Sequence, residues 1–333
     1  MGNEVDAGTS SAAEPARPGA ASGTDGGTGG GDGSGRTGAQ FVDDDLLAAV
    51  EQAVREVAAA EVLPRWRRLS DSDIAVKTGP YDLVTTADRL AEERLTQRLT
   101  ALLPGSVVVG EEAVSADPGV LGRLQGDAPV WVIDPVDGTA AFVRGEDGFA
   151  MMVALVSDGE PVASWTYAPR RGLFATARRG GGAHLDGRPL HTATGPGPVR
   201  LWTSSPVYRT GTERARLAQL EAAGAVCTPC GCAGLAYLDV ARGASDGVAF
   251  FWELPWDHAA GLLLVTEAGG ASLTAGGEPF RVAGGNELPF TAARNAATAA
   301  RVAAVLTGEP GAGPAPALLA DAHGAGAGGG EER

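Results

Sequence analysis

The chain is poor in several features that define whole classes of protein. Of its 333 residues only 3 are cysteines and 5% are aromatic, and Lys77 is the only lysine among 26 basic residues. Three cysteines do not make a disulfide framework, so a reducing compartment fits them better. The sequence has no run of about 18 apolar residues that could span a bilayer, and it has no signal-peptide pattern. We therefore expect a cytoplasmic protein that does not cross a membrane.

Positive charge is also scarce. The formal net charge of −15 at pH 7 argues against a nucleic-acid-binding protein, which would need a basic face. Several of the acids fall into short central motifs, and a buried acidic cluster is costly unless cations neutralise it. The isolated Lys77 indicates either a position that needs a compact ammonium group or a chance surface residue. The composition therefore favours an acidic site with a cationic partner.

The two ends of the chain differ from its centre. Residues 1–40 and 308–333 are rich in glycine and alanine, and we expect both to be disordered tails. Between them, the pattern of elements predicts an α+β N-terminal half over residues 41–198 and an α/β C-terminal half over residues 199–307. The hydrophobic content of 44% is enough for a sizeable core.

Hydrophobic periodicity and turn residues predict the individual elements. Predicted helices, the first capped by the Asp run at 43–45 and the second stopped by Pro104, cover residues 43–69, 87–102, 212–223, 257–269 and 296–306. Predicted strands cover residues 106–110, 130–134, 200–205, 247–252 and 289–293. Predicted hairpins cover residues 149–169 and 173–190, each with an Asp-Gly turn, and a short stretch at 274–280.

The stretch "VIDPVDGTAAF" places Asp134 and Asp137 one helical turn apart after a β-branched run. Both carboxylates can then approach one ion or a close pair of ions. Pro135 leaves the Val136 carbonyl free as a hard oxygen ligand. The amides of residues 138–140 open a turn whose dipole suits a phosphate. The alternative interpretation is an ordinary Asp-Gly turn.

Three further segments place an acid at the end of an element. Glu111 and Glu112 follow the strand-like "VVVG", Asp88 begins a helix after "DLVTT", and Asp257 begins the apolar helix "DHAAGLLLV". Taken singly, each has a plain structural interpretation as a solvated loop, a helix-dipole charge or an N-cap. A haloacid-dehalogenase-type site is discounted, because its two aspartates would be two residues apart and here they are three apart.

Taken together, "DLVTTAD", "GEE", "DPVDGT" and "WDHAAGLLLVTEAGG" resemble, in order and spacing, the signatures of the inositol monophosphatase family of Mg²⁺-dependent phosphatases. The resemblance covers about residues 42–307. It implies a layered αβαβα sandwich of the inositol monophosphatase and fructose-1,6-bisphosphatase type, in a family that is often dimeric. It also implies a small phosphomonoester substrate that is cleaved by water with two to three Mg²⁺ ions.

The resemblance also implies roles for individual residues. Glu111, Asp134 and the Val136 carbonyl resemble the ligands of a first Mg²⁺, and Glu111 also supports a third, weaker ion. Asp134, Asp137 and Asp257 resemble the ligands of a second ion. Asp88 and Thr139 are similar to the pair that activates the attacking water. The remaining implied roles are phosphate or substrate contacts for Gly138, Thr139, Ala140 and Lys77, and support of the ligands for Glu112.

Some positions depart from the family pattern. Gly231, Cys232 and Ala233 occupy a substrate-lining stretch of small residues, with Cys232 in place of serine; a zinc or redox site at Cys227, Cys230 and Cys232 is the weaker interpretation. Phe250 stands seven residues before Asp257, where inositol-cleaving members have a glutamate, and Glu253 is out of register. His258 is predicted to lie on a helix surface.

The sequence therefore predicts a Mg²⁺-dependent phosphatase that acts on a small polyol or amino-alcohol phosphate. Histidinol phosphate and 3′-phosphoadenosine 5′-phosphate are the alternative substrates, and a phosphate- or metal-binding protein without activity is the non-enzymatic alternative. The sequence leaves open the physiological substrate, the oligomeric state, the role of the tails and the redox activity of the cysteines.

Overall fold

The computed structural model describes residues 42–77 and 83–308. Its helices are α1 (Asp44–Val57), α2 (Thr86–Leu102), α3 (Glu111–Ala116), α4 (Thr139–Val143), α5 (Gly211–Ala222), α6 (Ala233–Ala241), α7 (Pro255–Glu267) and α8 (Ala296–Thr307). Short helical turns are η2 (Ala58–Val62), η3 (Asp71–Asp73), η4 (Pro118–Gln125) and η5 (Pro206–Tyr208). Asp82 and the predicted tails, apart from Gly308, lie outside the described residues.

The strands form two large sheets and one small one. The seven-stranded sheet has the order β3 (Val107–Gly110), β4 (Val130–Asp137), β5 (Ala150–Ser157), β6 (Glu160–Ala168), β7 (Leu173–Arg178), β8 (Gly182–Leu185), β9 (Arg188–Pro189). The five-stranded sheet has the order β11 (Val226–Pro229), β10 (Arg200–Thr203), β12 (Gly247–Phe250), β14 (Phe290–Ala293), β13 (Ala271–Thr274). β1 (Ile74–Val76) and β2 (Leu83–Thr85) pair with each other.

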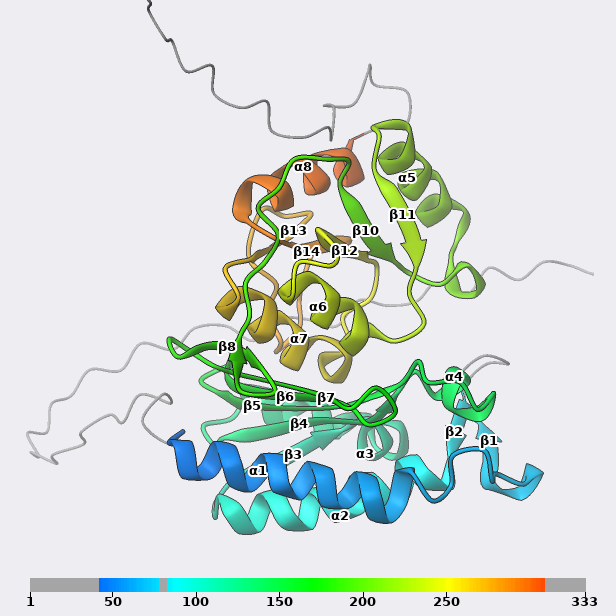
Figure 1. Ribbon diagram of the computed structural model, residues 1–333, viewed down its shortest axis with the longest axis vertical. Coiled ribbons are helices and arrows are strands. Elements are labelled where there is room, and N and C mark those ends of the chain that lie inside the picture. Colours follow the sequence, from blue (N-terminus) through cyan, green and yellow to red (C-terminus); the bar gives the residue numbers. More distant parts are fainter. Residues whose placement is uncertain (1–41, 78–82, 309–333) are drawn as a thin grey trace, which may run out of the picture. The chain divides into compact units, whose positions relative to one another are not determined.

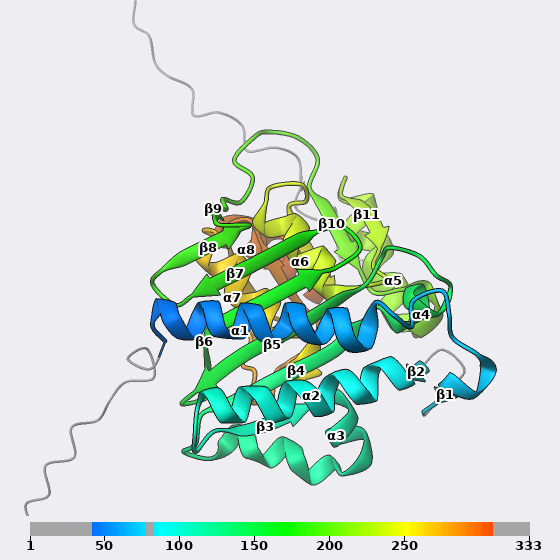
Figure 2. The ribbon, with the colours of Figure 1, turned by 60° about the horizontal axis from the view of Figure 1, so that its bottom comes forward.

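Helices and sheets within residues 42–308 alternate in five layers (Figure 1). α1 and α2 lie side by side across the outer face of the seven-stranded sheet (Figure 2). α6 and α7 lie between the two sheets, and α5 and α8 cover the five-stranded sheet. This arrangement confirms the predicted mixed α/β fold with αβαβα layering. The division into halves at residues 198 and 199 stays a prediction.

The predicted helices begin within two residues of their predicted starts, but the first helix is shorter than predicted. The Asp43 carboxylate accepts the N–H of Leu46 and so caps α1. The helix ends at Val57, and one π-helical turn carries the chain to Val62. Pro64 has no N–H for a helical hydrogen bond, so the prediction of a helix to Leu69 was wrong.

The segment around Asp134 and Asp137 is also not helical. Both residues belong to strand β4, whose register with β5 shifts between them. A β-bulge re-aims side chains next to the irregularity. The two carboxylates therefore reach one region through a bulged strand followed by a tight turn at Gly138, and the predicted helical turn was wrong.

Turn chemistry explains much of the seven-stranded sheet. Asp158 and Gly159 join β5 to β6, and Asp186 and Gly187 join β8 to β9, all four with positive φ. Positive φ at both central residues matches the twist of antiparallel strands, and Asp-Gly accepts it readily. The prediction of one hairpin over residues 173–190 was incomplete, because three strands lie there.

The five-stranded sheet and the helices next to it differ from the prediction in several elements. β11 and α6 were not predicted, and the stretch at 274–280 is no hairpin because β13 pairs with β14 instead. Almost every residue of α6 is buried, so the helix shows no polar face that a periodicity argument could detect.

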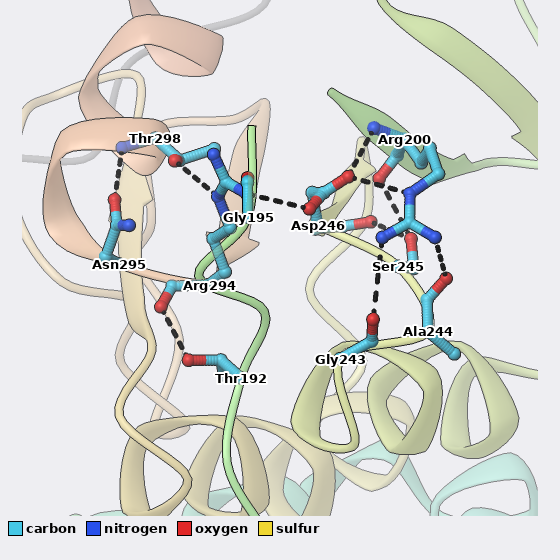
Figure 3. A network of polar contacts seen from close by, with 11 residues as sticks. Thr192, Gly195, Arg200, Gly243, Ala244, Ser245, Asp246, Arg294, Asn295 and Thr298 are labelled. Atoms are coloured by element: carbon cyan, nitrogen blue, oxygen red, sulfur yellow. Dashed lines mark hydrogen bonds and ion pairs between the residues drawn. The ribbon is translucent and has the colours of Figure 1, made fainter. Parts of the chain in front are cut away.

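A buried ionic network ties the 190–199 connection to this sheet (Figure 3). Asp246 is 3% exposed and accepts hydrogen bonds from the backbone N–H and the Nε of Arg200. Arg294, 5% exposed, donates to the Asp246 carboxylate and to the carbonyl of Gly195. Because both buried charges are paired, the network is compatible with the core.

Candidate active site

Asp134 occupies the centre of the acidic motifs. Its side chain is 2% exposed, and Oδ1 accepts the N–H of Val136 at 3.1 Å across the bulge. Burial is the largest cause that raises the pKa of Asp134 well above its usual range, followed by the negative charges of Glu111, Asp137, Asp257 and Asp88. Acids from four separate segments therefore surround this one carboxylate.

Asp137 connects β4 to the start of α6. Its carboxylate accepts the N–H groups of Ala233 at 3.1 Å and Gly234 at 2.6 Å, and the thiol of Cys232 donates to Oδ2 at 3.0 Å. A negative charge is favourable at a helix N-terminus. Burial raises the pKa of Asp137, and these hydrogen bonds act against the rise. The predicted residues Cys232 and Ala233 thus contact the predicted ligand Asp137.

The turn after Asp137 brings a second group of predicted residues together. Gly138 has φ of +87°, and a Cβ there would lie 2.7 Å from the carbonyl oxygen of Gly148 and 3.2 Å from that of Gly231. Both the positive φ and the lack of space for a Cβ require glycine here. Thr139 and Ala140 begin α4, where the first N–H groups of a helix have no partner within it.

Thr139 and Asp88 are within hydrogen-bond distance of each other. The Thr139 hydroxyl lies 3.2 Å from Asp88 Oδ1 and 2.9 Å from the Val136 carbonyl oxygen. Asp88 is 1% exposed and its Oδ2 accepts from both the N–H and the hydroxyl of Thr85 in a capping box. Burial raises the pKa of Asp88 to about 6, although the bonds from Thr85 oppose the rise.

Lys77 lies against the two glutamates of the "GEE" motif. Its Nζ donates to Glu111 Oε1 at 2.7 Å and to Glu112 Oε1 at 2.5 Å. Burial acts to lower the pKa of Lys77, but the charges and hydrogen bonds of the two glutamates outweigh it and the pKa is raised. Burial raises the pKa of Glu111 to about 8, with Lys77 acting in the opposite direction. The single lysine thus pairs with both predicted acids of the "GEE" motif.

Asp257 lies in the first turn of α7. The indole Nε1 of Trp252 donates to its Oδ2 at 2.5 Å. Burial raises the pKa of Asp257 to about 7, with a further contribution from the charge of Asp137, and hydrogen bonds with Trp252 and Asp134 oppose it. The segment that follows β12 thus reaches the acids of the other sheet.

The donors of this cluster fit a hard divalent cation. Carboxylates and a carbonyl oxygen are the ligands that Mg²⁺ prefers. The positive charge of Lys77 acts on Glu111 and opposes the rise in its pKa. Within residues 42–77 and 83–308, however, no three His, Cys, Asp or Glu side chains converge on a point that could hold a metal. Several carboxylates are instead turned toward protein donors, as Asp137 is toward α6 and Glu111 toward Lys77.

Comparisons with known proteins decide the family. The sequence model of the inositol monophosphatase family matches residues 43–307. The chain belongs to the inositol monophosphatase family. It is 37% identical over 247 residues to the inositol-1-monophosphatase of Rhizobium meliloti (strain 1021), covering 71% of this chain and 88% of that protein. Inositol monophosphatase 1 of Bos taurus is 31% identical over 240 residues, or 69% of this chain and 85% of that protein.

Solved structures agree with the sequence relatives. The crystal structure of the extragenic suppressor protein suhB from Bartonella henselae superposes with a TM-score of 0.67 at 26% identity, covering 79% of this chain and 98% of that one. The protein is therefore a phosphoric monoester hydrolase of the inositol monophosphatase family, whose members are generally metal-dependent. None of the helices in the described ranges is long and apolar enough to cross a membrane.

Phe250, at the position where the resemblance implies a glutamate, and the nearby Glu253 both bind to other parts of the protein. Phe250 is 0% exposed and packs against Trp252 and Phe290, with ring centroids 4.4 and 6.1 Å away. Its side chain is buried in an aromatic cluster and is not among the residues gathered around Asp134. Glu253 Oε2 accepts the backbone N–H and the side-chain amide of Asn286 at 3.0 and 2.9 Å.

His258 belongs to the same aromatic cluster. It is 0% exposed, with Nδ1 3.0 Å from the Tyr237 hydroxyl and Nε2 3.0 Å from the Trp252 carbonyl oxygen. Burial lowers the pKa of His258 to about 3. The prediction of a helix-surface position was wrong, because α7 is covered by both sheets and has almost no exposed side.

The three cysteines are free thiols. Cys230 and Cys232 are buried and Cys227 is half-buried. Burial raises the pKa of Cys227 to about 11 and raises those of the other two as well. Thiols that stay protonated are poor nucleophiles and poor metal ligands, which favours the packing interpretation of this cluster.

Several residues that contact the predicted acids were missed from the sequence, among them Trp252 and Glu92. Trp252 donates to Asp257, and Glu92 accepts the backbone N–H groups of Glu112 and Ala113. Glu92 carried a readable signal, since it lies one helical turn after Asp88 on a face otherwise formed by buried alanines and leucines. Trp252 carried none, because only the fold brings its indole to Asp257.

Proposed function

We propose that this family member hydrolyses a small phosphomonoester with Mg²⁺, using the acids around Asp134. The observation that carries the proposal is that the Thr139 hydroxyl lies 3.2 Å from Asp88 and 2.9 Å from the Val136 carbonyl oxygen, next to the buried carboxylate of Asp134. Buried negative charge of this kind calls for cations. Glu111, Asp134 and the Val136 carbonyl are the proposed ligands of one Mg²⁺, and Asp134, Asp137 and Asp257 of a second. A third, weaker ion is proposed to use Glu111.

The remaining roles follow from contacts. When bound, Mg²⁺ supplies positive charge that polarises a phosphoryl oxygen and helps water to lose a proton. The Thr139 hydroxyl, held between Asp88 and the Val136 carbonyl, orients the attacking water, and Asp88 accepts its proton. The amides of residues 138–140 hold the phosphoryl oxygens, where negative charge increases in the transition state. Lys77 bonds Glu111 and Glu112 and is also proposed to contact the phosphate or substrate, with Glu112 supporting the ligands.

The substrate class is a small polyol or amino-alcohol phosphate. The relatives are inositol monophosphatases by name, whereas Phe250 is buried and Glu253 is bonded to Asn286. Histidinol phosphate and 3′-phosphoadenosine 5′-phosphate therefore stay alternatives to inositol 1-phosphate. Turnover of these three and of fructose 1,6-bisphosphate, measured side by side as kcat/KM, ranks them. A cytoplasmic location and a homodimer also stay proposals.

Release of phosphate from p-nitrophenyl phosphate, with and without Mg²⁺, tests the activity. Asp137→Asn is expected to lower Mg²⁺-dependent turnover by at least ~100-fold, because a ligand charge is lost. The exposed Asp127→Asn is the matched control, and thermal melting shows whether the loss of the Asp137 contacts with α6 unfolds the variant. Wild-type protein without Mg²⁺-dependent turnover, or a fully active Asp137→Asn variant, would contradict the proposal.

A further inference from the structure

Glu92 is a buried acid that none of the roles above uses. It lies in α2 one turn after Asp88, so the two share a helix face, and it is 6% exposed. Its Oε2 accepts the N–H of Glu112 and its Oε1 accepts the N–H of Ala113, both at 2.8 Å. Both oxygens of Glu92 therefore contact the turn that carries the two glutamates of the site.

The contact from Glu92 replaces a side-chain cap that the start of α3 lacks. The residue before the helix is Gly110, which has no side chain to cap the first N–H groups. A carboxylate is the favoured group at this position because the helix dipole is positive there. Glu92 thus supplies, from another helix, the cap that α3 lacks.

Gly110 lies directly against the carboxylate of Glu92. Its φ is −109°, which any residue can adopt, so its backbone conformation does not require glycine. A Cβ at this position would lie 2.3 Å from Glu92 Cδ and 2.5 Å from each carboxylate oxygen. A side chain at Gly110 would therefore push the Glu92 carboxylate away from its contacts with the turn.

Besides Glu92, Lys77 contacts α3 through the side chains of Glu111 and Glu112. The helix has six residues, and Val114 is its one buried residue. A carboxylate buried near Glu112 is costly: burial raises the pKa of Glu92 to about 7, with the backbone hydrogen bonds of Glu112 and Ala113 acting against the rise. The chain thus keeps an acid at an unfavourable position, where it bonds the first turn of a short helix.

We propose that Glu92 is a positioning residue of the metal site: by holding the turn from Gly110 to Ala113, it sets the direction in which Glu111 and Glu112 point. This inference rests on the proposed function, because it takes Glu111 as a metal ligand. A plain structural cap would stabilise the protein without changing its affinity for Mg²⁺. The two roles therefore differ in what a Glu92 variant does to metal binding.

The test uses Glu92→Gln, which keeps the size of the side chain but leaves one oxygen acceptor for two N–H groups. We expect the dissociation constant of Mg²⁺, measured by calorimetry on the full-length protein, to rise by at least ~10-fold. The half-activating Mg²⁺ concentration for p-nitrophenyl phosphate hydrolysis should rise in parallel, with kcat at saturating Mg²⁺ within about threefold of wild type. Glu92→Asp, which keeps the charge, should fall between the two.

Two control variants separate positioning from stability. Glu93→Gln removes an exposed carboxylate from the same helix and should change neither constant. Leu99→Val removes buried volume from α2 and should lower the melting temperature without changing the affinity for Mg²⁺. A Glu92→Gln variant that melts earlier but binds Mg²⁺ as tightly as wild type would overturn the proposal.

A double-mutant cycle covers the case in which Glu92→Gln does not fold. Gly110→Ala should lower the melting temperature strongly in the wild-type chain and much less in a Glu92→Asp background, where the shorter side chain leaves room for the Cβ. Equal effects in both backgrounds would overturn the link between Gly110 and Glu92. Wild-type protein that binds Mg²⁺ but releases no phosphate would contradict the activity alone, whereas one that binds no Mg²⁺ would contradict both proposals.

Discussion

At the scale of single residues, the acids of the proposed site are held by donors from both near and distant parts of the chain. Cys232 and Gly234 donate to Asp137, Trp252 donates to Asp257, and Lys77 donates to Glu111. Each contact sets the direction of one carboxylate, and each partially offsets the cost of burying it. Changes at these residues should therefore alter pKa values and affinities more than the fold.

Asp88→Asn should change how stability depends on pH. The pKa of Asp88 is raised from 3.8 to about 6 by burial, so this group contributes stability below about pH 4 that is lost as the pH rises through 6. Asparagine cannot ionise, so the stability of the variant relative to wild type should increase by about 2–3 kcal/mol between pH 4 and pH 7. Urea unfolding in a chelator at both pH values measures this, and a difference that does not vary with pH would contradict it.

Cys232 gives a prediction about the hydrogen bond to Asp137. Cys232→Ser retains a donor and should keep Mg²⁺-dependent turnover within about threefold of wild type, whereas Cys232→Ala should lower it by about tenfold. Steady-state kinetics with p-nitrophenyl phosphate compares the two. Cys227→Ser is the control, since that cysteine lies in β11 and the charges that act on its pKa are those of Glu221 and Arg209, outside the site. Equal activity of the serine and alanine variants would show that the thiol does not matter as a donor.

At the scale of elements, the sequence and the structure agree where local chemistry decides. The capping boxes at Thr85 and Thr210, and the Asp-Gly turns at 158 and 186, depend on neighbours within four residues, and the helices and turns near them were predicted. The elements that were missed depend on burial: α6 is apolar all round, and the bulge in β4 appears only against its partner β5. The predicted ligands were identified by motif order and not by the helical spacing first assumed for Asp134 and Asp137.

The ionic network at Asp246 gives a prediction about how the 190–199 connection and the C-terminal sheet are joined. Asp246→Ala leaves the buried guanidinium of Arg294 without its ion-pair partner, so we expect a loss of about 3–5 kcal/mol in the free energy of unfolding. Urea unfolding at pH 7 measures the loss. Glu160→Ala, which breaks an exposed pair with Arg179, is the control and should have a much smaller effect. Similar losses in the two variants would contradict this view of the network.

At the scale of the whole molecule, the layered fold brings both sheets to one acidic site. β4 of the seven-stranded sheet supplies Asp134 and Asp137, while α6 and α7, packed between the sheets, supply the contacts of Cys232 and Asp257. The central acids lie close enough for their charges to act on one another, and Asp88 and Asp134 among them are fully buried. Metal binding should accordingly stabilise the whole fold and not one sheet alone.

A chain of residues 42–308 should retain the activity. The buried apolar residues of the described part form clusters between Val42 and Leu306, and the family match ends at residue 307. We expect Mg²⁺-dependent turnover within twofold of the full-length protein and a melting temperature within about 3 °C. A shortened chain that aggregates, or that loses activity while folded, would show that residues outside this range contribute to either property.

The sequence by itself determined the family, the layered fold class and the order of the acidic motifs. Short-range rules of capping, turns and periodicity act within a few residues, so they can be read from the chain directly. Only the tertiary structure decided that Asp137 caps α6, that Phe250 and His258 are buried, and that Glu92 lies under Gly110. These contacts join residues up to about a hundred positions apart, such as Asp137 and Gly234, and no local preference specifies them. They follow from packing two sheets around shared helices.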